Sequence, residues 1–155
     1  MTGVLIERQK LVQEWVTNYP IKLRPKLNPR KFRAPTKDWW KTADIAGYQA
    51  QWGGEVAAQK LTDYLRPDAI TIYIHANEET KGITKFIVDH KLHADPNGDI
   101  EIINAFWDFA DEEPLPETVP PILVYADLIA TLDPRNLETA KFIYDQYLTN
   151  TFTNT

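Results

Sequence analysis

The sequence contains neither cysteine nor serine, and it has no long apolar run. Without cysteine the chain can form no disulfide, no thiolate nucleophile and no thiolate metal site. Without serine it can form no serine triad, which excludes many hydrolases. No stretch approaches the roughly 20 apolar residues of a membrane span, and residues 1–10 do not resemble a secretory signal. We therefore expect a cytoplasmic protein with no membrane contact.

Positive charge is scarce in most of the chain and is concentrated at its beginning. Residues 1–33 hold eight Lys/Arg against two Asp/Glu, a net charge of +6, whereas residues 34–155 hold nine against twenty, a net charge of −11. An acidic body repels phosphate backbones, so any DNA contact would have to use the basic front. The candidate DNA contacts are Lys22, Arg24, Lys26, Arg30, Lys31 and Arg33.

The length of 155 residues fits one domain, and the periodicity of its apolar residues predicts a mixed α/β (α+β) fold with a small sheet flanked by several helices. We expect an N-terminal helix over residues 1–19, a basic proline-rich connector over 20–35, an α/β domain over 36–148 and a frayed tail over 149–155. The connector has four prolines, which favour extended chain, with room for a short strand.

Helices and strands within these parts follow from spacing and capping residues. Helical spacing over 4–19 ends before Pro20, and Thr36 is a candidate N-cap for a short helix carrying Trp39 and Trp40. A further helix follows Gly53 and Gly54, and the Arg66-Pro67 pair closes it. In the middle of the chain we expect a strand over 69–76 and a helix over 77–90. A tight turn over 95–98 joins residues 91–94 to a strand over 99–104. An acidic loop over 108–121 and helices over 122–131 and 134–148 complete the chain, and Asp133 caps the last helix.

Three patterns could carry chemistry, and each has a structural interpretation beside it. Gly53-Gly54-Glu55 before a helix resembles a phosphate loop only distantly, because Glu55 would repel a phosphate. His90 and His93 could bind a metal with Asp89 or Asp95, but the predicted helix ends near His90, so the two histidines need not share a face. A metal-dependent nuclease would use Glu55, Asp99 and Glu101, but the lysine expected two residues further on is missing. We therefore expect a protein that is not an enzyme, with no catalytic residue, no metal and no cofactor.

Several short motifs, in order, resemble the AbiEi-type antitoxin family of transcriptional regulators. They lie at Tyr19-Pro20 with Leu23-Arg24-Pro25-Lys26-Leu27, at Trp52-Gly53-Gly54-Glu55 with Ala57-Ala58, at Leu61-Thr62-Asp63-Tyr64-Leu65-Arg66-Pro67, at Tyr125-Ala126-Asp127-Leu128 and at Asp133-Pro134-Arg135-Asn136. The family-signature residues are Trp52, Gly53, Gly54, Glu55, Tyr64, Arg66, Pro67, Asp127, Asp133, Pro134, Arg135 and Asn136. Among them, we expect Arg66 and Arg135 to pair with buried or partly buried carboxylates.

The resemblance implies the regulatory antitoxin domain of a bacterial type IV toxin–antitoxin, or abortive-infection, system that acts in phage defence. Such a domain counteracts a nucleotidyltransferase-like toxin without forming a stable complex with it, and a winged helix-turn-helix in front binds the promoter. The stretch before Val4 is too short for that module, so we expect promoter contact through the basic front or through a missing N-terminal module. Two alternatives stay open: the nuclease-like enzyme and a generic DNA-binding regulator.

Overall fold

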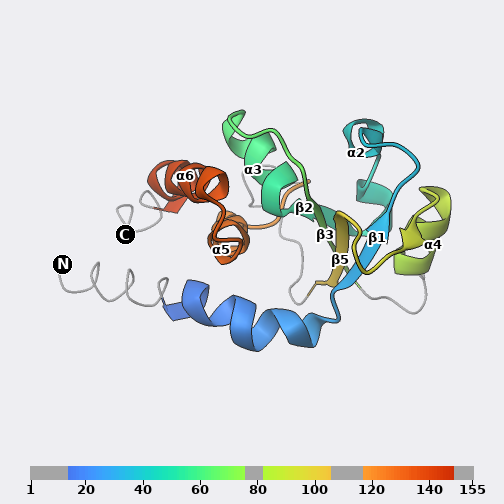
Figure 1. The fold of residues 1–155 in the computed structure, drawn as a ribbon, viewed down its shortest axis with the longest axis horizontal. Helices are drawn as coiled ribbons and strands as arrows, with labels where there is room; N and C mark the ends of the chain where they lie inside the picture. Colours follow the sequence, from blue (N-terminus) through green and yellow to red (C-terminus); the bar gives the residue numbers. More distant parts are fainter. Residues whose placement is uncertain (1–13, 76–81, 106–116, 149–155) are drawn as a thin grey trace.

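A five-stranded mixed sheet with helices on both faces forms the protein (Figure 1). The computed structural model describes residues 14–75, 82–105 and 117–148. The strands lie in the order β2-β3-β5-β1-β4, where only β3 and β5 run parallel. Their bounds are β1 Arg30–Arg33, β2 Ala50–Gly53, β3 Ile70–Ile74, β4 His93–Ala94 and β5 Ile100–Asn104. The predicted mixed α/β class is confirmed.

The helices divide into two groups, one on each face of the sheet (Figure 1). On one face lie α3 (Gly54–Thr62), α5 (Pro121–Ala130) and α6 (Pro134–Ile143), with the N-terminal segment beside them; on the other lie α2 (Trp39–Thr42) and α4 (Gly82–Asp89). Side chains alternate along each strand, so one face of β3 and β5 presents five isoleucines and the other presents Thr71, Tyr73, Glu101 and Ile103. The isoleucine face carries the aromatic core, in which Trp39 contacts both Trp52 and Phe86.

The N-terminal helix does not end before Pro20, as the sequence analysis predicted. Residues 14–18 are helical, the π-helix η1 (Tyr19–Leu23) follows directly, and a 3-10 turn η2 (Arg24–Leu27) completes the segment. The N–H of Arg24 donates to the carbonyl of Tyr19, five residues earlier. This wider turn accommodates a proline ring that would otherwise collide with a carbonyl of the preceding turn.

Two other boundaries differ from the predicted ones, and one strand was not predicted. The short tryptophan helix α2 has Asp38 rather than Thr36 at its N-cap position, and α3 ends at Thr62 because Asp63 adopts a left-handed conformation (φ 57°). The strand β2, which pairs with β3, has no counterpart in the prediction, because its four residues lie directly against α3 and carry no long alternation. Residues 1–13, 76–81, 108–116 and 149–155 of the predicted elements lie outside the described residues.

The basic segment, for which the sequence allowed a short strand, supplies β1, and this strand lies inside the sheet between β5 and β4. The predicted turn over 95–98 is present, with the N–H of Gly98 donating to the Asp95 carbonyl at 2.9 Å. The two strands that it joins are not neighbours, because β1 lies between them. A Cβ on Gly98 would come within 2.0 Å of the Phe32 carbonyl oxygen, so only glycine fits where the turn crosses β1.

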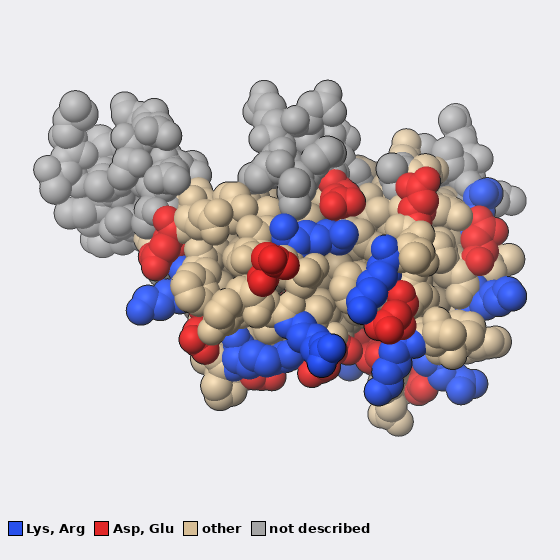
Figure 2. All heavy atoms as spheres, turned by 90° about the horizontal axis from the view of Figure 1, so that it is seen from above, with Lys and Arg blue, Asp and Glu red and all other residues tan. Residues whose placement is uncertain are grey.

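The predicted closing helices are confirmed. In α6 the Asp133 side chain accepts a hydrogen bond from the N–H of Arg135 at 2.9 Å, which makes Asp133 the N-cap, and the helix continues into a π turn, η4 (Tyr144–Leu148). On the face drawn in Figure 2, Lys/Arg and Asp/Glu side chains are interspersed and form no continuous basic patch. Among the described residues, no helix is long and apolar enough to cross a membrane.

Candidate functional site

A polar network lies between the sheet and α5, where a core of this size would normally be apolar. The strand register places Thr71 opposite Glu101, and Lys31 opposite Glu101 on its other side, so all three side chains share the face that α5 covers. Asp127 projects from α5 toward the same face and is 6% exposed. Charged groups at such depth are stable only when they are paired.

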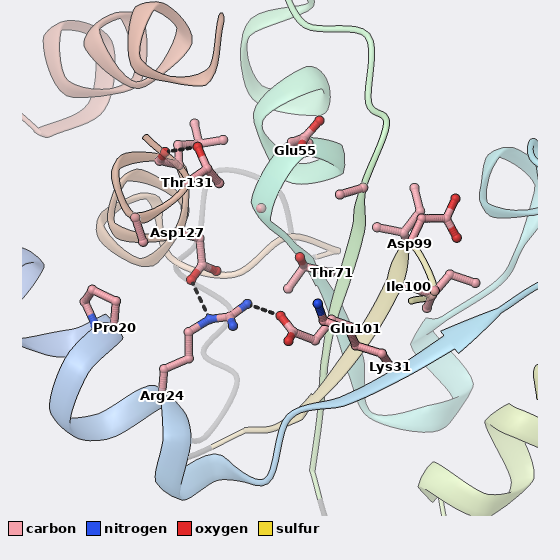
Figure 3. A pocket seen from close by; sticks show the side chains of 16 residues that line it. Pro20, Arg24, Lys31, Glu55, Thr71, Asp99, Ile100, Glu101, Asp127 and Thr131 are labelled. Carbon is pink, nitrogen blue, oxygen red and sulfur yellow. Dashed lines mark hydrogen bonds and ion pairs between the residues drawn. The ribbon is translucent and has the colours of Figure 1, made fainter. Parts of the chain in front are cut away.

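Arg24 joins the N-terminal segment to both α5 and the sheet (Figure 3). Its Nε donates to Asp127 Oδ1 at 3.3 Å and its Nη2 donates to Glu101 Oε1. On the other oxygen, Tyr73 donates to Asp127 Oδ2 at 2.8 Å, and the hydroxyls of Tyr73 and Tyr19 are 2.5 Å apart. Both oxygens of Asp127 are therefore bonded, and α5, β3 and the N-terminal segment meet at this carboxylate.

Burial controls the protonation of this network. Burial raises the pKa of Asp127 from 3.8 to about 6, against the opposing effects of the Arg24 charge and the Tyr73 hydrogen bond. Burial and the Asp127 charge raise the pKa values of Tyr73 and Tyr19 above their usual range. Burial alone would lower the pKa of Arg24, but Asp127 and Glu101 together outweigh it and raise that pKa. At neutral pH the network therefore holds one guanidinium, two neutral tyrosines, the Glu101 carboxyl group and the Asp127 carboxyl group, whose pKa is about 6.

A second cluster links α3 to α6 through Glu55. Its Oε1 accepts a hydrogen bond from Arg135 Nη2 at 2.8 Å and another from the N–H of Asp68 at 3.0 Å, while Oε2 faces Asn136 Nδ2 at 3.4 Å. Arg135 also donates through Nη1 to the Arg66 carbonyl at 2.6 Å. Glu55 is thus held away from the start of its own helix by partners on two other segments.

The two arginines expected to pair with carboxylates behave differently. Arg135 forms the ion pair with the buried Glu55. The side chain of Arg66 is exposed and has no ion pair with any described residue; what it contributes is its backbone carbonyl. The expectation for Arg66 is wrong, because α3 ends at Thr62 and Arg66 therefore lies in an exposed connection rather than on a packed helix face.

Most of the other family-signature residues pack against aromatic rings or lie at the start of a helix. Trp52 is 1% exposed and contacts Trp39 and Trp40, with ring centroids 6.1 Å and 6.5 Å apart. Tyr64 is 53% exposed and lies on Phe142, at 4.8 Å between centroids. Gly53 and Gly54 begin α3, Pro67 is half-buried in the connection that follows it, and Pro134 is the first residue of α6.

Of the six candidate DNA contacts, only Arg24 is withdrawn from the surface. Its guanidinium is bound to Asp127 and Glu101, whereas the other five side chains are exposed: Lys22, Lys26, Arg30, Lys31 and Arg33. Lys31 also lines a pocket of about 350 Å³ between the sheet, the start of α3 and α5. Figure 3 shows that pocket with Arg24, Thr71, Glu101 and Asp127 on its walls.

The three acids of the alternative nuclease hypothesis all line this pocket but do not form a metal site. Glu55 is bonded to Arg135, Glu101 is bonded to Arg24, and the Asp99 carboxylate points away from Thr71 (Figure 3). Within residues 14–75, 82–105 and 117–148, no group of three His, Asp or Glu residues is placed to hold a metal ion, and this includes His90 and His93.

The sequence analysis did not identify Tyr19, Thr71 and Tyr73 as members of a site. A signal for two of them was present, since Thr71 and Tyr73 alternate with isoleucines in a strand whose two faces are both covered. Such a strand is usually apolar throughout, so its polar alternate positions indicated a buried polar layer. Tyr19 carried no comparable signal, because the widened turn that positions it depends on Pro20.

Comparison with known proteins gives one family. A family model described as "Transcriptional regulator, AbiEi antitoxin, Type IV TA system" matches residues 4–149. Searches of curated proteins and of solved structures gave no match. The matched residues include the whole sheet, both polar clusters and the pocket.

Proposed function

The chain belongs to the AbiEi antitoxin family of type IV toxin–antitoxin transcriptional regulators, and from this premise we propose that it is the antitoxin that counteracts a nucleotidyltransferase-like toxin. The observation that carries the proposal is the extent of the match, which includes every described residue rather than one motif. The protein would act without holding the toxin in a stable complex. The charged side chains interspersed on the face in Figure 2 accord with that mode, since charged residues are depleted at the core of protein–protein interfaces.

A rescue experiment tests the antitoxin activity. The chain is co-expressed with the nucleotidyltransferase-like protein encoded next to its gene, and growth is measured with and without induction of that protein. We expect the chain to restore growth, and we expect tagged toxin to bring down little or none of it. A folded chain that fails to restore growth would contradict the proposed activity, and a stable equimolar complex would contradict the proposed mode.

We also propose that the basic front contributes to promoter contact and so to autoregulation. Four exposed cations of the segment do not line the pocket, namely Lys22, Lys26, Arg30 and Arg33. Arg24 is left out because its charge is used inside the protein. Cations of this kind contact phosphates and carry little sequence information, so specificity would come from elsewhere in the regulator.

Replacing those four cations with glutamine is expected to weaken binding of a promoter fragment and to reduce its salt dependence. Each lost phosphate contact lowers the slope of log K against log salt by about 0.9, so the slope should fall by roughly 2–4. The measurement is a titration by fluorescence anisotropy at several salt concentrations. The matched control replaces Lys60, Lys85 and Lys141, which lie outside the segment, and an equal loss in that control would contradict a specific role for the front.

A further inference from the structure

The pocket between the sheet, the start of α3 and α5 contains hydrogen-bond donors that have no partner among the described residues. Thr71 is 9% exposed, and its hydroxyl forms no hydrogen bond with any described residue, although its strand neighbours on the same face, Tyr73 and Glu101, are both bonded. Lys31 lines the same pocket and has no ion pair within the described part of the chain. The Thr71 hydroxyl opens onto the cavity, so a molecule bound there could accept a hydrogen bond from it.

The start of α3 faces the same hydroxyl. The first N–H groups of an α-helix have no partner within the helix, and no side chain caps α3. Its first residue is Gly54, at φ +50°, and a Cβ there would lie 2.8 Å from Thr71 Oγ1. The two glycines therefore bring bare backbone next to the hydroxyl, at the positive end of a nine-residue helix.

The acids around the pocket are mostly satisfied from within the protein. Asp127 is bonded through both oxygens, Glu101 is bonded to Arg24, and Glu55 is bonded to Arg135 and to the Asp68 N–H. Asp99 is directed away from Thr71 (Figure 3). Besides these acids, the cavity presents a hydroxyl, an ammonium group and helix N–H groups, each of which can donate a hydrogen bond.

We infer that this pocket binds the oxyanion of a small phosphorylated molecule, with the phosphate between Thr71, Lys31 and the N-terminus of α3. Helix N-termini that meet a hydroxyl and a lysine are suited to phosphate, because the helix dipole and the ammonium group both favour negative charge. The volume of about 350 Å³ lies at the low end of the roughly 300–1,000 Å³ of small-molecule sites. The remaining walls include apolar Ile70, Ile100 and Leu128, which suit an organic group attached to the phosphate.

The inference also explains Glu55, whose side chain would otherwise repel an anion at this helix start. Arg135 and the N–H of Asp68 hold the carboxylate on the α6 side, away from Thr71 (Figure 3). The pair with Arg135 also offsets its charge. The binding site would therefore depend on the Glu55–Arg135 pair without using it as a ligand.

The test measures binding of inorganic phosphate and, in a second arm, of a nucleoside 5′-monophosphate, by calorimetry against chloride at equal ionic strength. We expect saturable binding that Thr71→Val and Lys31→Gln each weaken on the order of tenfold. The exposed Lys26→Gln is the matched control and should bind as the unaltered chain does. Binding in the nucleotide arm alone would identify the organic group as part of the ligand, and binding in both arms would show that phosphate suffices.

Thr71→Val provides a second readout that distinguishes the site from damage to the fold. Because the hydroxyl has no partner, its removal should leave the thermal midpoint in phosphate-free buffer unchanged or raise it, while abolishing the increase that phosphate produces. Absence of saturable binding in both arms, or equal binding by Thr71→Val and the unaltered chain, would overturn the inference.

Discussion

Arg24→Met is expected to lower the free energy of unfolding by about 3 kcal/mol at pH 7, near the lower end of values for breaking a buried ion pair. The variant keeps the apolar stem but leaves Asp127 and Glu101 without their shared cation, and Asp127 is almost fully buried. An unpaired carboxylate at that depth costs more than the intact ion pair contributes. Because the Arg24 side chain is 22% exposed, water screens part of the ion pair, and we expect the loss of unfolding free energy to lie below the largest values for buried pairs.

Chemical denaturation measures this effect, and Lys26→Met is the matched control. Lys26 lies two residues away in the same 3-10 turn and is exposed, so its replacement should change stability by less than about 0.5 kcal/mol. A double variant, Arg24→Met with Asp127→Leu, should recover part of the loss, because replacing both partners removes the buried unpaired charge. Equal effects of Arg24→Met and Lys26→Met would mean that the ion pair contributes nothing to the fold.

The position of Arg24 also changes the interpretation of the basic segment. As sequence, residues 22–33 are a run of cations and prolines, and all six cations are equivalent candidates for DNA contact. In the structure one of them anchors the segment onto α5 and β5, and the strand β1 lies inside the sheet. The segment is therefore built into the domain that it was predicted only to precede, and the five other cations are presented on a fixed backbone.

The sequence predicted those elements whose signals are local. Asp133 with Pro134 marked the start of α6, Gly53 and Gly54 marked the start of α3, and the alternating isoleucines marked β3. Each of these depends on capping, backbone freedom or periodicity within a few residues. The α/β class followed from their sum.

The site could not be predicted in the same way, because its members come together only through long-range pairing. Arg24 and Asp127 are 103 positions apart, and Glu55 and Arg135 are 80 apart. Nothing within either neighbourhood indicates which arginine meets which carboxylate, and the expectation for Arg66 was wrong for this reason. Lys31 and Thr71 flank Glu101 because β5 lies between β1 and β3 in the sheet, and no local pattern encodes that strand order.

The pH dependence of stability tests which force controls Asp127. Its pKa is about 6 in the folded chain against 3.8 ordinarily, so between those values the folded state holds a proton that the unfolded state has released. Stability from this group is therefore greatest below pH 4, falls as the pH rises toward 6 and is level above that. The shift of about two units corresponds to a loss on the order of 2–3 kcal/mol.

Asp127→Asn isolates this contribution from that of other carboxylates, because asparagine resembles the protonated acid at every pH. We expect the difference in unfolding free energy, unaltered chain minus Asp127→Asn, to decrease from pH 4 to about pH 6 and to be level above that. A difference that increased over the same range would show that the attraction of Arg24 outweighs burial, and parallel profiles would show that Asp127 has the same pKa folded and unfolded. In Arg24→Met the pKa should rise further, because only burial remains, so the cost of that substitution should shrink in acid as Asp127 takes up its proton. The two experiments are thus linked: a loss of stability in Arg24→Met that did not diminish at low pH would mean that an unpaired Asp127 is not its cause.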